Sequence, residues 1–158
     1  MKTSCSDLVV GNSCGVRVES FDIVVYGGTS AGVIAAVQAA RMGRRVVVIE
    51  PGRHLGGLTS GGLGMTDSGN KAVIGGLARE FYQRIKKHYD ADASWRQQTK
   101  ADYGFYDAAA DALFRFEPHV AEQVFGEMAR EAGVEIVLGE RLERAKGVVK
   151  SDDRLVSI

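Results

Sequence analysis

The chain has 158 residues, of which 45% are hydrophobic and 25% charged, and its formal net charge is zero. This length suits one domain, and the composition is that of an ordinary globular protein. The balanced charge gives no electrostatic footprint for nucleic acid or an anionic membrane, and no apolar run reaches the ~18 residues of a spanning helix. The first residues lack the apolar segment of a secretory signal, so we expect a cytoplasmic protein.

The first 20 residues show no clear hydrophobic period, and we interpret them as an N-terminal tail ahead of a domain at 21–158. Both cysteines, Cys5 and Cys14, lie in this segment, where reduced thiols are the simplest interpretation. The sequence contains no Cys/His cluster with the spacing of zinc ligands, so we predict no metal site.

The domain begins with a strand–helix–strand pattern. Residues 23–26 form a short β-branched run that ends in glycine, which is typical of a buried parallel strand. Residues 30–42 carry apolar side chains at helical spacing, and Gly43 is a favourable helix end. Residues 44–50, "RRVVVIE", predict a second strand. This βαβ order requires a parallel sheet and a right-handed crossover, so we predict an α/β, Rossmann-like dinucleotide-binding domain.

A glycine-rich segment, residues 52–76, follows the second strand. Eight glycines fall within 21 positions there, which indicates a loop with special backbone needs. Residues 76–89 predict a helix, because apolar side chains recur every four residues. Residues 90–116 are mixed and aromatic, and their pattern predicts no element.

The last part of the chain alternates again between helix and strand patterns. Residues 117–133 predict a helix with Pro118 in its first turn and Gly133 at its end. Residues 134–139 predict a strand, and residues 140–158 predict two short strands joined by a turn at Ser151–Asp153.

The stretch "YGGTSAG", residues 26–32, resembles a phosphate-binding glycine loop of the form G-x-G-x-x-G. Gly27 stands where the loop must turn, and Gly32 where helix and strand must pack tightly. Thr29 replaces the middle glycine, so its Cβ should push a diphosphate slightly outward. The hydroxyls of Thr29 and Ser30 offer hydrogen bonds in return.

An acidic residue stands at the distance that such a loop requires. Glu50 lies 23 residues after Gly27 at the end of the second predicted strand, where an acid binds ribose hydroxyls. A carboxylate there repels a 2′-phosphate, which disfavours NADP. Val33 occupies the place of the lysine of a nucleotide-triphosphatase loop, so that class is excluded.

Four segments together resemble the glutathione-reductase-like flavoproteins, and most closely the branch known as FAD-dependent oxidoreductases, some of which carry the label xanthan lyase. The segments are "YGGTSAGVIAAVQAARMG", "VVVIEPGRHLGGLTSGGLG", "GGLAREFY" and "FEPHVAEQVF". The resemblance implies that the cofactor is FAD. It implies that the pyrophosphate meets Gly27, Gly28, Thr29, Ser30, Ala31 and Gly32, that Glu50 takes the adenosine ribose, and that the cofactor continues along Gly56, Gly57, Leu58 and Thr59. A strand near residues 140–142 is expected to contact adenine through its backbone.

The resemblance also implies parts that the 158 residues do not supply, because flavoproteins of this fold share their chemistry with a later substrate domain. We therefore expect an FAD-binding domain that is incomplete at its C-terminus, in a flavin-dependent oxidoreductase of unknown small-molecule substrate. An NAD-dependent enzyme and a non-catalytic fragment with an incomplete cofactor site are the alternatives. The sequence names no catalytic residue and predicts no oligomeric state.

Histidines and aromatic residues outside these motifs have simpler interpretations. We expect a solvated loop position for His54 and surface or structural positions for His88 and His119. The aromatic residues of 95–106 are either a stacking surface for a ring system or, as we favour, part of the core: Trp95, Tyr103, Phe105 and Tyr106.

Overall fold

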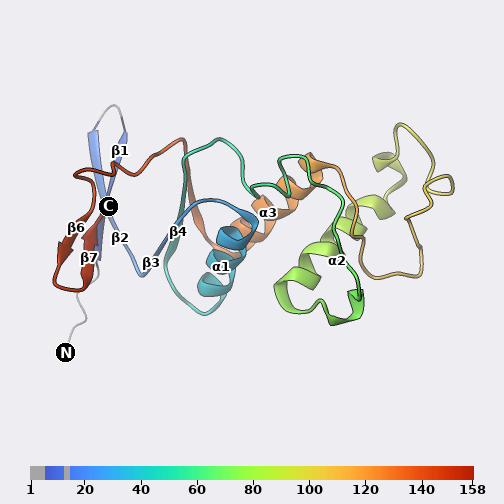
Figure 1. Cartoon of the computed structure of the whole chain (residues 1–158), viewed down its shortest axis with the longest axis horizontal. Helices are drawn as coiled ribbons and strands as arrows, with labels where there is room; N and C mark the ends of the chain where they lie inside the picture. The colour runs from blue at the N-terminus through green and yellow to red at the C-terminus, as the bar shows by residue number, and fades with distance from the viewer. Residues whose placement is uncertain (1–5, 13–14) are drawn as a thin grey trace.

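A computed structural model describes residues 6–12 and 15–158 (Figure 1). The helices are α1 Ser30–Arg41, α2 Gly76–Asp90 and α3 Pro118–Ala132, with short 3₁₀ turns at Lys71–Val73 and Asp92–Ser94. The strands are β1 Ser6–Asn12, β2 Gly15–Phe21, β3 Ile23–Tyr26, β4 Val46–Glu50, β5 Glu135–Leu138, β6 Val149–Ser151 and β7 Arg154–Ser157. None of the helices in these ranges is both long and apolar enough to cross a membrane.

The centre of the fold is a parallel sheet of three strands in the order β3–β4–β5. Val46 to Ile49 of the middle strand are all buried, which explains their continuous β-branched run. The predicted α/β class, the βαβ unit and the strand within residues 134–139 are thereby confirmed.

One face of the sheet carries the main core. Val33 and Val37 of α1 pack there with Val48 of β4 and with Phe125 and Met128 of α3, and all five side chains are buried. Helix α2 lies on the far side of α3 from the sheet (Figure 1). Its Phe81 ring stacks on Phe125 with centroids 4.5 Å apart. The other face of the sheet has a smaller cluster that includes Phe21, Val47 and Ile49.

The N-terminal segment forms a structure that the sequence did not predict. Strands β1 and β2 pair as an antiparallel hairpin, for which the sequence analysis predicted no regular element. Residues 16–19 do alternate apolar and charged side chains, but four residues are too few to stand out as a period-two pattern. Cys5 and Cys14 lie outside the described residues.

The C-terminal hairpin of β6 and β7 confirms the predicted turn, which includes Asp152 at a φ of 53°. Strand β1 contacts β7, and Figure 1 shows both hairpins at the end of the molecule opposite α2. The predicted helix limits are also confirmed, because Pro118 begins α3 and Gly133 ends it in the left-handed conformation at a φ of 74°.

An ion-pair network joins the three helices. Arg41 of α1 contacts Glu80 of α2 at 2.6 Å, and Arg84 contacts Glu80 at 2.9 Å and Glu131 of α3 at 2.6 Å. The hydrogen bond from Arg41, with a second from Arg84, lowers the pKa of Glu80 to about 2 from an ordinary 4.5. Since the ionised form stabilises the fold, this contribution is fully present above about pH 4.5 and is lost as the pH falls toward 2.

We expect Glu80→Gln to lower the free energy of unfolding by about 1 kcal/mol at neutral pH, because two partly exposed ion pairs are lost. Denaturant unfolding of parent and variant across the acid range should show the difference shrinking below pH 4.5. Asp153→Asn, which changes an exposed carboxylate outside the network, serves as the control. A difference that stays constant with pH would contradict the role of this carboxylate.

Candidate functional site

Three chain segments meet at the carboxyl ends of β3 and β4, which is the edge where open α/β sheets bind ligands. The segments are residues 26–32, Glu50 and residues 56–59. The sequence indicated each of them, and the structure brings them into direct contact.

The two outer glycines of the loop perform the backbone roles that the motif requires. Gly27 has a φ of 105°, and its N–H donates to the Ile49 carbonyl at 2.8 Å. A Cβ on Gly32 would lie 2.2 Å from the Gly27 carbonyl oxygen. The first turn of α1 is therefore seated directly on the loop, at a distance that excludes any side chain.

Thr29 is the N-cap of α1, which explains a threonine at the place of the middle glycine. Its Oγ1 accepts a hydrogen bond from the Gly32 N–H at 3.1 Å. Threonine is a favourable N-cap because its hydroxyl satisfies one of the free amides of the first turn. The Thr29 hydroxyl oxygen thus accepts a hydrogen bond from the helix, and the hydroxyl proton stays free to donate to a ligand.

The start of α1 presents free donors. Among the described residues, nothing accepts a hydrogen bond from the backbone N–H of Thr29 or of Ala31. Both residues are exposed, and the helix dipole adds positive potential at this end. Free amides at a helix N-terminus form a binding place for an anionic group such as phosphate.

The second glycine segment lies alongside the first. The Gly56 N–H donates to the Gly28 carbonyl at 2.7 Å, and Thr29 and Gly56 form a parallel bridge. Thr59 Oγ1 donates to Ser30 Oγ at 3.3 Å. The close approach depends on glycine, since a Cβ on Gly56 would lie 2.7 Å from the Phe125 ring.

The remaining two members of this segment are more open. Gly57 has a φ of 56°, and a Cβ there would lie 3.4 Å from Thr29. Leu58 is 74% exposed, so its side chain projects away from the core. The four predicted residues Gly56 to Thr59 therefore lie in one loop but differ in their exposure and contacts.

Glu50 lies between the two loops. Its Oε2 accepts from the Gly28 N–H at 2.6 Å, and its Oε1 accepts from the Gly52 N–H at 2.6 Å. The sequence analysis identified Glu50 and Gly28 as site residues but did not identify Gly52. The available indication was that Gly52 is a glycine two positions after Glu50. Two amide donors hold the carboxylate in place at the strand end.

The loop after β4 is also tied to α3. Nδ1 of His54 lies 3.0 Å from Glu122 Oε1, and the Leu55 N–H donates to the same oxygen at 3.2 Å. His54 is exposed, as the sequence predicted. Glu122 was not identified from the sequence, because an acid on the surface of a helix carries no motif.

The expected strand near residues 140–142 is wrong. Strand β5 ends at Leu138, and residues 140–142 have no regular structure. Gly139, at a φ of 80°, turns the chain, and its N–H donates to the Glu50 carbonyl at 2.8 Å. The Leu142 N–H donates to the Tyr26 hydroxyl at 3.2 Å, so the segment still passes close to the loop.

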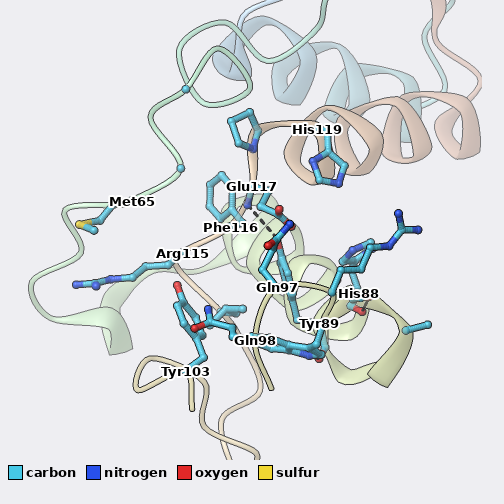
Figure 2. Close-up of a pocket in the computed structure, with 18 residues that line it drawn as sticks. Met65, His88, Tyr89, Gln97, Gln98, Tyr103, Arg115, Phe116, Glu117 and His119 are labelled. Carbon is cyan, nitrogen blue, oxygen red and sulfur yellow. Dashed lines mark hydrogen bonds between the residues drawn. The ribbon is translucent and has the colours of Figure 1, made fainter. Parts of the chain in front are cut away.

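A pocket of about 740 Å³ lies beside the end of the glycine segment (Figure 2). His88 and His119 line it, as do Trp95 and Tyr103 from the segment that the sequence left without an element. Trp95 and Tyr106 also pack against the core, whereas Phe105 is 54% exposed. Trp95 and Tyr106 thus have the core role that we favoured from the sequence, and stacking on a ring system stays a prediction. In residues 6–12 and 15–158, no group of three His, Cys, Asp or Glu side chains could hold a metal ion.

Comparison with known proteins identifies the family. Residues 22–158 match the sequence model of the family described as FAD dependent oxidoreductase. The vinyl phenol reductase of Lactiplantibacillus plantarum is 29% identical over 117 residues, which are 74% of this chain and 21% of that protein. A 3-oxosteroid 1-dehydrogenase of Mycobacterium tuberculosis (strain H37Rv) is 49% identical over 45 residues, 28% of this chain and 8% of that protein. The chain therefore spans about a fifth or less of the length of these relatives.

A similar fold occurs in a solved structure. CabE, an aromatic hydroxylase from angucycline biosynthesis, has a TM-score of 0.50 and 20% sequence identity, over 96% of this chain and 27% of that one. The family match confirms the resemblance seen in the sequence. It also confirms FAD as the cofactor of the family and flavin-dependent oxidoreduction as its chemistry.

We expect Gly32→Ala to destabilise the fold by about 1–3 kcal/mol, because the new Cβ would overlap the Gly27 carbonyl. Gly126→Ala is the matched control, since Gly126 lies inside α3 with open space around its Cα and should gain about 0.5–1 kcal/mol of stability. Thermal and denaturant unfolding would measure both changes. Equal effects of the two substitutions would contradict the tight packing of helix on loop.

Proposed function

Because the chain belongs to the family of FAD-dependent oxidoreductases, we propose that it holds the adenosine diphosphate half of FAD in a flavin-dependent oxidoreductase. The observation that carries the proposal is the meeting of the glycine loop, Glu50 and the second glycine segment at one edge of the sheet. When bound, the flavin supplies the redox chemistry, and the protein supplies binding and orientation.

The pyrophosphate would lie at the start of α1. The free N–H groups of Thr29 and Ala31 and the Thr29 hydroxyl proton are donors for its oxygens. Gly27, with no atom within 4 Å of the place of a Cβ, leaves the approach open. Gly28 and Ser30 complete the turn, and Gly32 sets its distance from the helix.

The adenosine ribose would lie at Glu50. Each carboxylate oxygen accepts one backbone N–H, which leaves further lone pairs for ribose hydroxyl groups. The negative charge repels a 2′-phosphate, which favours FAD or NAD over NADP. The backbone of Gly56 to Thr59 would follow the cofactor beyond the pyrophosphate, where glycines leave room for it.

The balanced charge gives no electrostatic support for nucleic acid or an anionic membrane surface as a partner, and a small-molecule substrate stays a prediction. A cytoplasmic location and a domain limit at residue 21 stay predictions.

We expect this chain to bind FAD and Gly27→Val to abolish binding, because a β-branched side chain would block both the turn and the approach of the phosphates. Gly43→Val is the matched control. Gly43 also has a positive φ, 81°, and open space, but it lies at the other end of α1. The strain on the fold is therefore similar, whereas the site is untouched.

Flavin absorbance retained after desalting and the thermal shift on adding FAD would measure this binding. Loss of flavin in Gly27→Val together with its retention in Gly43→Val supports the proposal. Equal flavin content in both variants would contradict the site. A thermal shift with NAD and none with FAD would contradict the cofactor.

We expect Glu50→Ala to weaken FAD binding by about 1–3 kcal/mol, because a charge-assisted hydrogen bond to the ribose is lost. Since Glu50 also accepts the Gly28 and Gly52 N–H groups, the same change should lower the melting temperature. Titration with FAD, with the melting curve recorded alongside, separates the two effects. An unchanged FAD dissociation constant would rule out the ribose assignment.

A further inference from the structure

The pocket of about 740 Å³ is formed by parts of the chain that the proposed cofactor site leaves unused. Within the described ranges, the residues assigned to FAD do not line it, but Gly62 and Gly64, just beyond Thr59, do. The other walls are the end of α2, the loop that follows it, residues 113–117 and the start of α3. The pocket thus begins where the proposed cofactor segment ends.

Aromatic rings form one wall of the pocket. The ring centroids of Tyr89 and Trp95 are 5.5 Å apart, and those of Trp95 and Tyr103 are 5.4 Å apart. Trp95 Nε1 donates to the Tyr89 carbonyl at 2.8 Å, so the polar atom of the indole is satisfied within the protein. Phe116, which is buried, adds a fourth ring. Such a wall favours a flat, apolar ligand body.

The polar lining of the pocket has an excess of positive charge. Arg96 and Arg115 line it, and Glu117 is the single acid among the lining residues that the structure describes. That acid is already engaged, since the Tyr89 hydroxyl donates to Glu117 Oε2 at 3.0 Å and accepts the Glu117 N–H at 2.9 Å. Burial raises the pKa of Tyr89 to about 12, so the phenol adds no negative charge.

Further polar groups line the same space. Arg115 and His88 lie on opposite sides of the pocket, with Gln97 and Gln98 between them, and the Arg115 side chain extends away from these two amides (Figure 2). In the described part of the chain, the two amide side chains and Arg96 have no hydrogen-bond partner. The start of α3 also opens here, which adds the positive end of a helix dipole.

We propose that this pocket binds the substrate of the oxidoreductase, and that the substrate is a small planar aromatic compound with a carboxylate group. The rings take the flat body, and arginine with the amides takes the carboxylate, for which the guanidinium fork is suited. The inference rests on the proposed function, because a substrate must lie next to the part of the cofactor that reacts.

Benzoate and its neutral isostere benzamide test the charge preference. Trp95 is the only tryptophan of the chain and lines the pocket, so its fluorescence reports binding directly. We expect benzoate to change the fluorescence and benzamide to bind about tenfold more weakly or worse, since it lacks the charge. Equal affinities, or a benzoate affinity in calorimetry with no response of Trp95, would overturn the proposal.

A variant tests the arginine contribution. Arg96→Gln should weaken benzoate binding several-fold and leave benzamide unchanged. Arg44→Gln is the matched control, because Arg44 is exposed and lies between α1 and β4, away from the pocket. Arg115 is not varied, because its guanidinium already lies over the Phe105 ring at 3.3 Å. A benzoate affinity that is unchanged in Arg96→Gln would overturn the role of charge.

Benzoate titrations with and without FAD distinguish a failure of this inference from a failure of the proposed function. Benzoate titrated in the presence of saturating FAD should still bind. If FAD abolishes benzoate binding, the pocket receives part of the cofactor, and the substrate proposal is overturned. FAD binding without any benzoate response overturns only the substrate proposal. Charge-selective benzoate binding in a chain that binds no FAD supports the anion pocket and overturns the proposed function.

Discussion

The carboxylate of Glu50 fixes how the two loops of the candidate site lie relative to the sheet. It accepts one N–H from the loop after β3 and another from the loop after β4, both at 2.6 Å. Because Glu50 ends the most deeply buried strand, its own position is set by the packing of β4. The group that would meet the ribose is therefore also the group that holds the two loops, so binding of a ribose there would be coupled to loop geometry through one side chain.

The three helices were predictable because their burial follows from the spacing of apolar side chains. The strands of the parallel sheet were predictable from short continuous runs of β-branched residues, and Gly133 and Pro118 mark helix limits by backbone chemistry alone. The N-terminal hairpin was missed because its alternation is short. Residues 90–116 were not assigned because their order comes from contacts such as Trp95 Nε1 with the Tyr89 carbonyl, which leave no period in the sequence.

Part of the candidate site was also predictable from the sequence. Glycines with a required backbone role, such as Gly27 and Gly32, are recognised by their position in a motif. Thr29 departs from the glycine motif, and the structure explains the departure because Thr29 caps α1. Glu122 acts through His54 and Leu55, which lie 68 and 67 residues away in the chain, and Glu117 acts through a partner 28 residues away. Such pairs depend on tertiary structure, so the sequence could not indicate them.

Strand β3 carries the glycine loop, yet within the described residues it is paired on one side only, with β4. Its end residues Ile23 and Tyr26 are 38% and 46% exposed, which is unusual for a strand of a parallel sheet. The main-chain amides and carbonyls along the outer edge offer a template for one more strand. A strand that paired there would add main-chain hydrogen bonds to β3 and so stiffen the turn that begins at Gly27.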